Sequence, residues 1–323
     1  MFEIQSSTYL KPKPFNWQIE GQRYATLAKK AGRFRILVVG RANAGKTTIL
    51  KKICNTTNDP DIYDIAGKKI DPSNIEPTTG RGAHNIANEM IFQSNPGFIF
   101  HDSCGFEAGG VDELEKVKHF ILERSQEKEL RNRVHVIWYC IPMNDSRPIT
   151  NAEIQFFSKI RTGKVPVIAV FTKCEGLELQ AIEELQNSQQ LSYLDALHGA
   201  PEYAKKYLQN THQVLKQYKY APQGHVYLQE MEKLITDCQE LVKCTSSVLD
   251  TNALQALFIS TQQVSLEISL KYATKKILDL KIKKPNDRIL SVSYIFKSIM
   301  DYFPYWLVCL LVNSAFTQVL LYC

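Results

Sequence analysis

The feature that most constrains this chain of 323 residues is the run Gly40-Arg-Ala-Asn-Ala-Gly-Lys-Thr47. It fits the pattern G-x-x-x-x-G-K-[ST] at every fixed position. A short β-rich apolar run, residues 34–39, precedes it, and a helix-compatible stretch, residues 46–55, follows it. Glycines let successive N–H groups curl around phosphate oxygens, and a helix N-terminus adds positive potential. The run therefore predicts a phosphate-binding loop that opens an α/β domain.

Each residue of this loop has an expected role. The Lys46 ammonium should neutralise terminal phosphate charge and assist catalysis, and the Thr47 hydroxyl should hold Mg²⁺. The residues expected to surround the phosphates are Gly40, Arg41, Ala42, Asn43, Ala44, Gly45, Lys46, Thr47 and Thr48.

A second motif, Asp102-Ser-Cys-Gly105, comes straight after the apolar run Phe98-Ile-Phe100. A carboxylate at the carboxyl end of a strand beside the phosphate loop is suited to bind Mg²⁺ through water. A glycine three residues later can offer its N–H to a terminal phosphate. We therefore expect Asp102 to be a metal ligand and Gly105 to sense the γ-phosphate.

A third motif, Thr172-Lys173-Cys174-Glu175, ends the apolar run at residues 165–171. It is similar to a base-reading motif, [NT]-K-x-D, with glutamate in place of aspartate. A carboxylate there accepts hydrogen bonds from guanine N1–H and the exocyclic amine, and the lysine stem packs on the base. Guanine is favoured over adenine, because the edge of adenine presents fewer hydrogen-bond donors to a carboxylate.

A polar, glycine-flanked loop, Glu76-Pro-Thr-Thr-Gly-Arg-Gly82, lies between the first two motifs. A threonine hydroxyl in such a loop can close onto Mg²⁺ when a γ-phosphate is present. Thr79 is the preferred metal ligand and catalytic group, and Thr78 is the alternative.

Further apolar runs recur along the chain at residues 97–101, 134–141, 165–171 and 225–228, separated by helix-compatible segments such as 112–130 and 151–160. Continuous apolar strands alternating with helices predict a mostly parallel sheet of six strands, covered by helices on both faces. Residues 175–222 predict one or two amphipathic helices before the last strand. From residue 237 the pattern is helical again.

The three motifs in this order resemble the TRAFAC class of P-loop GTPases, over about residues 34–228. The wording Asn-Ala-Gly-Lys-Thr is closest to the Era/TrmE-like branch, and the chain also resembles fungal G-domain proteins, there including Leu254–Gln263. The resemblance implies a G domain that binds GTP or GDP with Mg²⁺ and acts as a nucleotide-dependent switch. It names no effector protein.

The chain departs from this family at two places. Phe106 follows Gly105, where many members carry nearby a glutamine that orients the attacking water, so intrinsic hydrolysis should be slow unless Glu107 or His101 takes that role. The usual serine-alanine pair of the fifth motif is missing. Its candidate positions are Leu228-Gln-Glu-Met231 and Cys244-Thr-Ser246.

Asn43 suggests a further cofactor. In potassium-dependent members of the Era/TrmE-like branch, an asparagine at this position helps to bind K⁺. By resemblance, K⁺ together with self-association across the nucleotide face would partly replace the missing catalytic groups. Cys104 and Cys174 lie inside the second and third motifs and are interpreted as small semi-buried side chains rather than reactive thiols.

Composition narrows the remaining function classes. The net charge of +6 is mild and no run of five like charges occurs, so nucleic-acid binding is not indicated. No secretory segment is visible at the start, and the simplest compartment is the cytoplasm. Residues 305–323 carry no charge and follow a lysine-rich stretch, 271–284. They are a candidate tail anchor, although a polar stripe along them suits a helix packed on protein, or an interfacial one, better than a lone span in lipid.

The expected organisation has four parts. These are an N-terminal extension (1–33), a G domain (34–250) with a helical insertion at about 176–222, a helical extension (251–300) and an apolar C-terminal helix (302–323). Two alternative functions stay open: an ATP-binding P-loop protein, and a scaffold that binds GTP without hydrolysing it.

Overall fold

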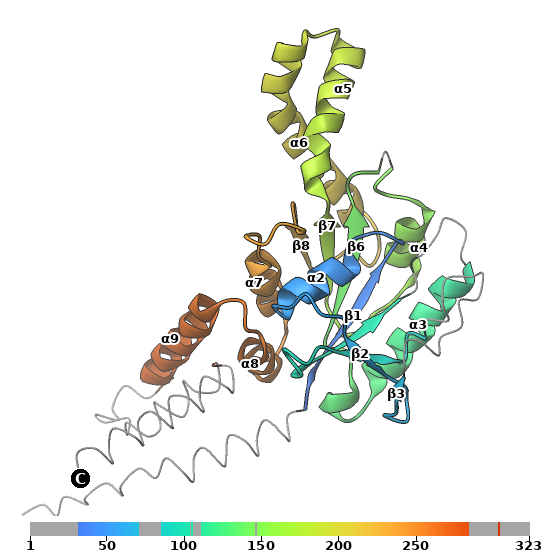
Figure 1. Cartoon of the computed structure of the whole chain (residues 1–323). Helices are drawn as coiled ribbons and strands as arrows, with labels where there is room; N and C mark the ends of the chain where they lie inside the picture. Colours follow the sequence, from blue (N-terminus) through green and yellow to red (C-terminus); the bar gives the residue numbers. More distant parts are fainter. Residues whose placement is uncertain are drawn as a thin grey trace, which may run out of the picture.

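The computed structural model describes residues 32–70, 85–103, 105, 111–145, 147–283 and 303. Its centre is a sheet in which eight strands follow the order β3-β2-β4-β5-β1-β6-β7-β8 (Figure 1). The strands are β1 (Phe34–Gly40), β2 (Asp61–Tyr63), β3 (Lys69–Ile70), β4 (Glu89–Ile91), β5 (Phe98–Asp102), β6 (Val136–Pro142), β7 (Val167–Thr172) and β8 (Gly224–Tyr227).

The five strands from β5 to β8 across the sheet are parallel, and β4, β2 and β3 add antiparallel pairs at one edge. All five apolar runs of the sequence form strands, and they are the parallel ones. The expected total of six strands was wrong. The three strands outside these runs are only two or three residues long, and so short a stretch carries no hydrophobic pattern that identifies a strand.

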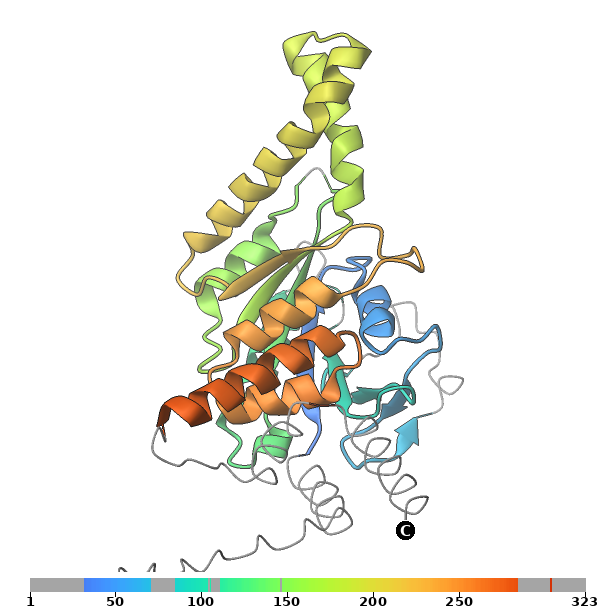
Figure 2. The same cartoon turned by 90° about the vertical axis from the view of Figure 1, so that its left-hand side faces the viewer.

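Helices cover both faces of the sheet. The helices of the described residues are α2 (Lys46–Ile53), α3 (Val111–Gln126), α4 (Asn151–Lys159), α5 (Leu177–Gln189), α6 (Tyr193–Lys216), α7 (Gln239–Val248), α8 (Asn252–Thr261) and α9 (Leu266–Lys283), with short 3₁₀ turns η2 (Leu130–Asn132) and η3 (Cys174–Gly176). Figure 2 shows α7, α8 and α9 side by side on the face that α2 shares, and α3 and α4 lie on the other face.

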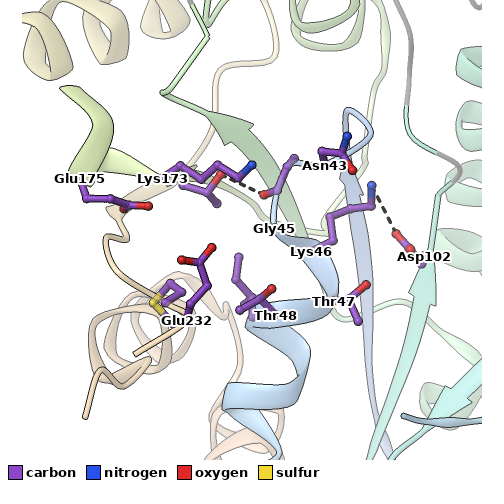
Figure 3. Close-up of a pocket in the computed structure, with 13 residues that line it drawn as sticks. Asn43, Gly45, Lys46, Thr47, Thr48, Asp102, Lys173, Glu175 and Glu232 are labelled. Carbon is purple, nitrogen blue, oxygen red and sulfur yellow. Dashed lines mark hydrogen bonds and ion pairs between the residues drawn. The ribbon is translucent and has the colours of Figure 1, made fainter. Parts of the chain in front are cut away.

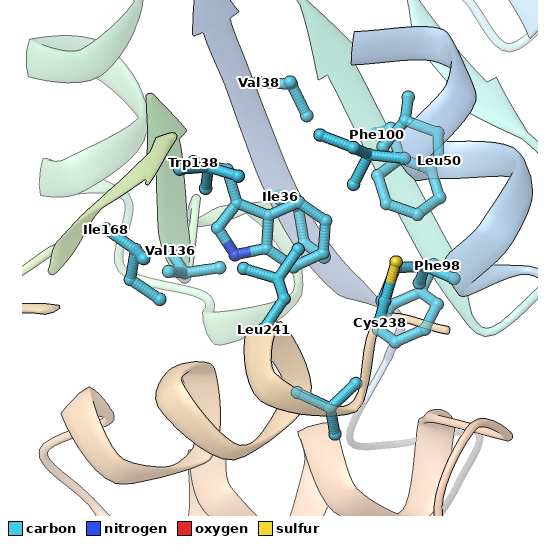
Figure 4. Packing of buried hydrophobic residues seen from close by; sticks show 14 of the residues in the cluster. Ile36, Val38, Leu50, Phe98, Phe100, Val136, Trp138, Ile168, Cys238 and Leu241 are labelled. Atoms are coloured by element: carbon cyan, nitrogen blue, oxygen red, sulfur yellow. The ribbon is translucent and has the colours of Figure 1, made fainter. Parts of the chain in front are cut away.

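The central strands are apolar throughout because both faces of the sheet are buried. In β1, Ile36 and Val38 enter the cluster that contains Trp138 and Leu241 of α7 (Figure 4). Leu37 and Val39, which alternate with them, enter the cluster on the α3 and α4 face. Trp138 is fully buried, and its indole N–H donates to Thr245 Oγ1 at 3.2 Å, which fixes α7 to the sheet.

The first helix of the predicted extension shares this core. Phe258 of α8 is fully buried and lies 4.9 Å from the ring of Phe34 and 5.9 Å from that of Phe98. Asn95, in the turn before β5, donates to the Thr261 carbonyl at 3.0 Å at the end of α8. Residues 251–261 are therefore packed as part of the sheet domain.

Helices α5 and α6 form an antiparallel hairpin that projects from the sheet domain (Figures 1 and 2), and we call residues 177–204 the arm. These helices occupy most of the predicted insertion at 176–222. The arm has a small core of its own, made by Ala181, Ile182, Leu185, Ala196 and Ala200.

Within the described part of the chain, no helix is long and apolar enough to cross a membrane. Of the predicted apolar C-terminal helix, 302–323, only Phe303 is described, and it packs against the core cluster that α8 and α9 share with the sheet. The candidate anchor at 305–323 and most of the N-terminal extension lie outside the described residues.

Candidate functional site

A pocket of about 400 Å³ opens at the carboxyl ends of β1 and β7. Figure 3 shows its residues converging from the loop before α2, from the end of β5, from the segment after β7 and from the loop after β8. It is lined by Asn43, Ala44, Gly45, Lys46, Thr47, Thr48, Ile49, Asp102, Thr172, Lys173, Glu175, Met231 and Glu232. Residues from all three sequence motifs thus meet at one pocket.

The loop before α2 has the backbone conformation that a phosphate cradle needs. Asn43 and Gly45 have φ angles of 59° and 77°, in the left-handed region, and Gly45 is the N-cap of α2. No side chain caps this helix, and no acidic residue lies in its first turn. Its first N–H groups and its dipole are therefore directed at the pocket.

Lys46 supplies the cation of the pocket and is itself largely buried, with 8% exposed. Its ammonium donates to the carbonyls of Gly40 and Arg41 at 3.2 and 3.1 Å. The Asp102 Oδ1 atom lies 3.9 Å away. These contacts hold the charge over the loop, between the helix N-terminus and the end of β5.

The Arg41 side chain points away from the phosphate loop. Its guanidinium contacts Asp145 at 2.8 Å, the Pro148 carbonyl at 2.8 Å and the fully buried Glu153 at 3.5 Å. Gly40, Arg41 and Ala42 are not among the residues that line the pocket. Any contact of Arg41 with a ligand is therefore left to its backbone.

Gly105 lies directly against the phosphate loop, because a Cβ atom added there would overlap the backbone of Ala42. Only glycine permits this approach. The other candidates of this region fall outside the described residues: Thr78, Thr79, Cys104, Phe106 and Glu107.

Thr172 connects the base-reading motif to the phosphate loop. It is buried, and its hydroxyl donates to the Ala44 carbonyl at 2.9 Å. This hydroxyl is therefore engaged with protein, so Thr172 positions the two loops relative to each other. The next residue, Lys173, has a φ angle of 57°, which turns the chain sharply into η3.

Glu175 connects the end of β7 to the loop after β8. Its Oε2 atom accepts the backbone N–H of Glu230 at 2.8 Å. The same loop brings Met231 and Glu232 to the pocket. Of the two candidate fifth motifs, Leu228–Met231 therefore lies at the pocket, whereas Cys244–Ser246 lies in α7.

Lys52 holds this loop from the other side. Its ammonium, on α2, donates to the carbonyls of Lys233 and Thr236, the second at 3.1 Å. Lys233 in turn pairs with Glu230 at 2.6 Å. Sequence reasoning missed both Lys52 and the pocket residue Glu232, because their positions depend on how the loop after β8 returns to α2.

Two candidate side chains are excluded from chemistry at the pocket. His101 is fully buried, contacts Arg35 at 3.1 Å and packs on Phe120, so it cannot orient a water molecule as the sequence suggested. Burial lowers its pKa to about 3. Cys174 is buried too, and burial raises its pKa to about 12, which agrees with its interpretation as an unreactive thiol.

Comparison with protein families identifies the fold. Residues 35–173 match the family model described as 50S ribosome-binding GTPase. The matched stretch runs from β1 through the phosphate loop to Lys173. Residues 35–173 are therefore similar to a P-loop GTPase G domain. A G domain of this family implies binding of a guanine nucleotide, and the sheet with its helices on both faces has the matching fold.

The G domain can also be compared with solved structures. One that it resembles is a GDP-bound point mutant of the S. thermophilus FeoB G-domain, with 12% identity, a TM-score of 0.35, and coverage of 83% of this chain and 77% of that one. Likeness at this level carries no conclusion about function. No curated protein sequence matches the chain.

Proposed function

We propose that this protein is a guanine-nucleotide switch that binds GTP and GDP with Mg²⁺ and hydrolyses GTP slowly. The observation that carries the proposal is the joint lining of one pocket by Lys46 and Glu175. A cation at the phosphate end and a carboxylate at the other end match a guanine nucleotide, whose base offers two adjacent donors. Adenine offers a carboxylate no such pair.

The proposed roles follow from the contacts of each group. The N–H groups of residues 40–48 cradle the phosphates, and Lys46 neutralises their charge. Glu175 accepts from guanine N1–H and the exocyclic amine, while the Lys173 stem packs on the base. Thr172 positions the loops through Ala44.

The residues present fit a Mg²⁺ site. Thr47 offers a hydroxyl and Asp102 a carboxylate, and both line the same pocket. Oxygen ligands are those that Mg²⁺ prefers, usually with several waters retained. When bound, the ion would neutralise charge on the β- and γ-phosphates. Thr79 remains the proposed third ligand, and Gly105 the proposed sensor of the γ-phosphate.

Slow hydrolysis is proposed because Phe106 stands where a water-orienting glutamine is common and His101 is buried in the core. A scaffold that binds GTP without hydrolysis is the limiting case. Asn43, which lines the pocket, is the proposed K⁺ contact. This role requires faster turnover in KCl than in NaCl at equal ionic strength, and equal rates would exclude it.

Competition binding tests the proposal. Fluorescent GTP is titrated into the full chain with Mg²⁺ and displaced by unlabelled GTP, GDP or ATP. We expect GTP and GDP to compete and ATP to fail, and Lys46→Ala to remove binding. Lys51→Ala is the matched control, because Lys51 lies on the same helix but pairs with Asp59 at 2.8 Å. Equal competition by ATP would refute guanine specificity.

A further inference from the structure

The arm has a one-sided charge. Residues 177–204 contain five acidic residues, and neither a lysine nor an arginine occurs among them. The acidic residues are Glu178, Glu183, Glu184, Asp195 and Glu202. A surface of this composition repels anionic lipid headgroups and nucleic acid, and it attracts a basic protein surface.

The tip of the arm also exposes large apolar side chains. Tyr193, Leu194 and Leu197 are 58%, 64% and 44% exposed, whereas Ala196 and Ala200 of the same helix are buried in the arm. In the first turns of α6, the small residues are therefore buried in the arm and the large apolar residues are exposed to solvent. An apolar patch flanked by charged residues is typical of a protein interaction site.

The opposite composition occurs on α9. Leu266 and Leu270, one helical turn apart, are 54% and 51% exposed. Lys271 and Lys275, also one turn apart, are exposed beside them, and Glu267 is the exposed acidic residue of this stretch. The outer face of α9 is thus apolar along one edge and basic along the other.

The arm tip and α9 lie at opposite ends of the molecule in both views (Figures 1 and 2). One molecule therefore cannot join its own two surfaces, and equal charges oppose pairing of two arms or of two α9 helices. We propose that the arm tip of one copy docks on α9 of a second copy. Such a head-to-tail contact leaves one arm and one α9 unused, so it extends to further copies.

Sedimentation velocity of the full chain over a concentration series tests this contact. We expect association that weakens with added salt, because charge complementarity contributes to it. Leu194→Ser/Leu197→Ser on the arm and Leu266→Ser/Leu270→Ser on α9 should each weaken self-association at least about tenfold. All four side chains are exposed, so the variants should keep the thermal unfolding midpoint of the wild type.

Mixing the two variants gives the decisive measurement. The arm variant keeps an intact α9 and the α9 variant keeps an intact arm, so the mixture should form a one-to-one dimer and nothing larger. Leu179→Ser is the matched control, since Leu179 is 69% exposed on α5 but lies outside the tip patch. A monomeric wild type, association that neither double variant weakens, or a mixture that stays monomeric would each overturn the proposal. Binding of the arm only to some other basic protein would overturn it too.

Discussion

Glu175 accepts a hydrogen bond from the backbone N–H of Glu230 at 2.8 Å, across the mouth of the pocket. This bond joins the segment after β7 to the loop after β8, 55 residues further along the chain. One carboxylate oxygen, Oε2, thereby fixes the loop, and the other remains available for the proposed contact with a base. The glutamate that the sequence shows in place of aspartate can therefore serve both as a loop anchor and as a base reader.

Replacing Glu175 by glutamine tests this double role. The amide oxygen can still accept from Glu230, but the amide nitrogen then presents donors to the two donors of guanine. We expect the dissociation constants of GTP and GDP to rise about 10- to 100-fold, the effect of a buried donor left unpaired. Competition binding measures this. Glu178→Gln, one turn away on α5 and outside the pocket, should leave both constants unchanged.

Lys52 provides a second prediction. Its ammonium caps the carbonyls of Lys233 and Thr236 and so holds the loop that carries Met231 and Glu232. Lys52→Met keeps the length of the side chain but loses these bonds. We expect guanine-nucleotide affinity to fall about 3- to 10-fold, as for the loss of one or two ordinary hydrogen bonds.

Hydrogen exchange locates the effect of Lys52→Met. Exchange of the amides in residues 230–236 should become faster while that of β1 and β7 stays unchanged. Lys51→Met, on the same helix, is the control. Unchanged exchange in this loop would show that Lys52 does not hold it.

Thr172→Val separates positioning from general stability. Valine keeps the shape of the buried side chain but leaves the Ala44 carbonyl without its partner, at a cost of about 1–3 kcal/mol. We expect this change to lower both the free energy of unfolding and the affinity for GDP. Thr245→Val removes an equally buried hydroxyl bonded to Trp138, far from the pocket, and should lower stability alone. Equal effects of both variants on GDP affinity would contradict a positioning role for Thr172.

Most of the parallel sheet and the phosphate end of the pocket were predictable, because each depends on local sequence. A continuous apolar strand, a glycine turn and a helix occupy consecutive residues, so the sequence from Phe34 to Ile53 is enough to predict the local structure. The Lys46 side chain then lies over the loop that precedes its helix, where its ammonium donates to the carbonyls of Gly40 and Arg41.

The end of the pocket around Glu175 was harder to predict from the sequence, because it is assembled from segments that lie far apart in the chain. Glu230 has a positive φ angle of 51° in a stretch without glycine, and no sequence pattern there predicts such a turn. His101 was one of two candidates for orienting the attacking water, although a histidine at a strand end is more often solvated or packed. The structure buries it, and its ring packs against Phe120 of α3.

His101 and His135 predict an acid-sensitive fold. Both are buried, and their pKa values are lowered to about 3 and about 4, mainly by burial and then by charge from Arg35. His101 contacts the Arg35 guanidinium at 3.1 Å, and His135 Nδ1 accepts the Arg35 backbone N–H at 3.0 Å. Each ring also contacts a backbone carbonyl through its other nitrogen. An added proton would therefore remove the acceptor that each of these contacts with Arg35 requires.

The sign of the pH effect follows from these pKa values. In the unfolded chain a histidine titrates near pH 6.5, so between that value and pH 3–4 the unfolded state binds more protons. Stability is complete above pH 6.5 and falls as the pH is lowered. At pH 5 each histidine should have removed about 2 kcal/mol from the free energy of unfolding relative to pH 7. Urea denaturation at the two pH values measures the total difference, and His135→Asn should reduce it by about 2 kcal/mol because one titrating group is gone. Equal stability at pH 5 and pH 7 would mean that the two rings are not buried in neutral form.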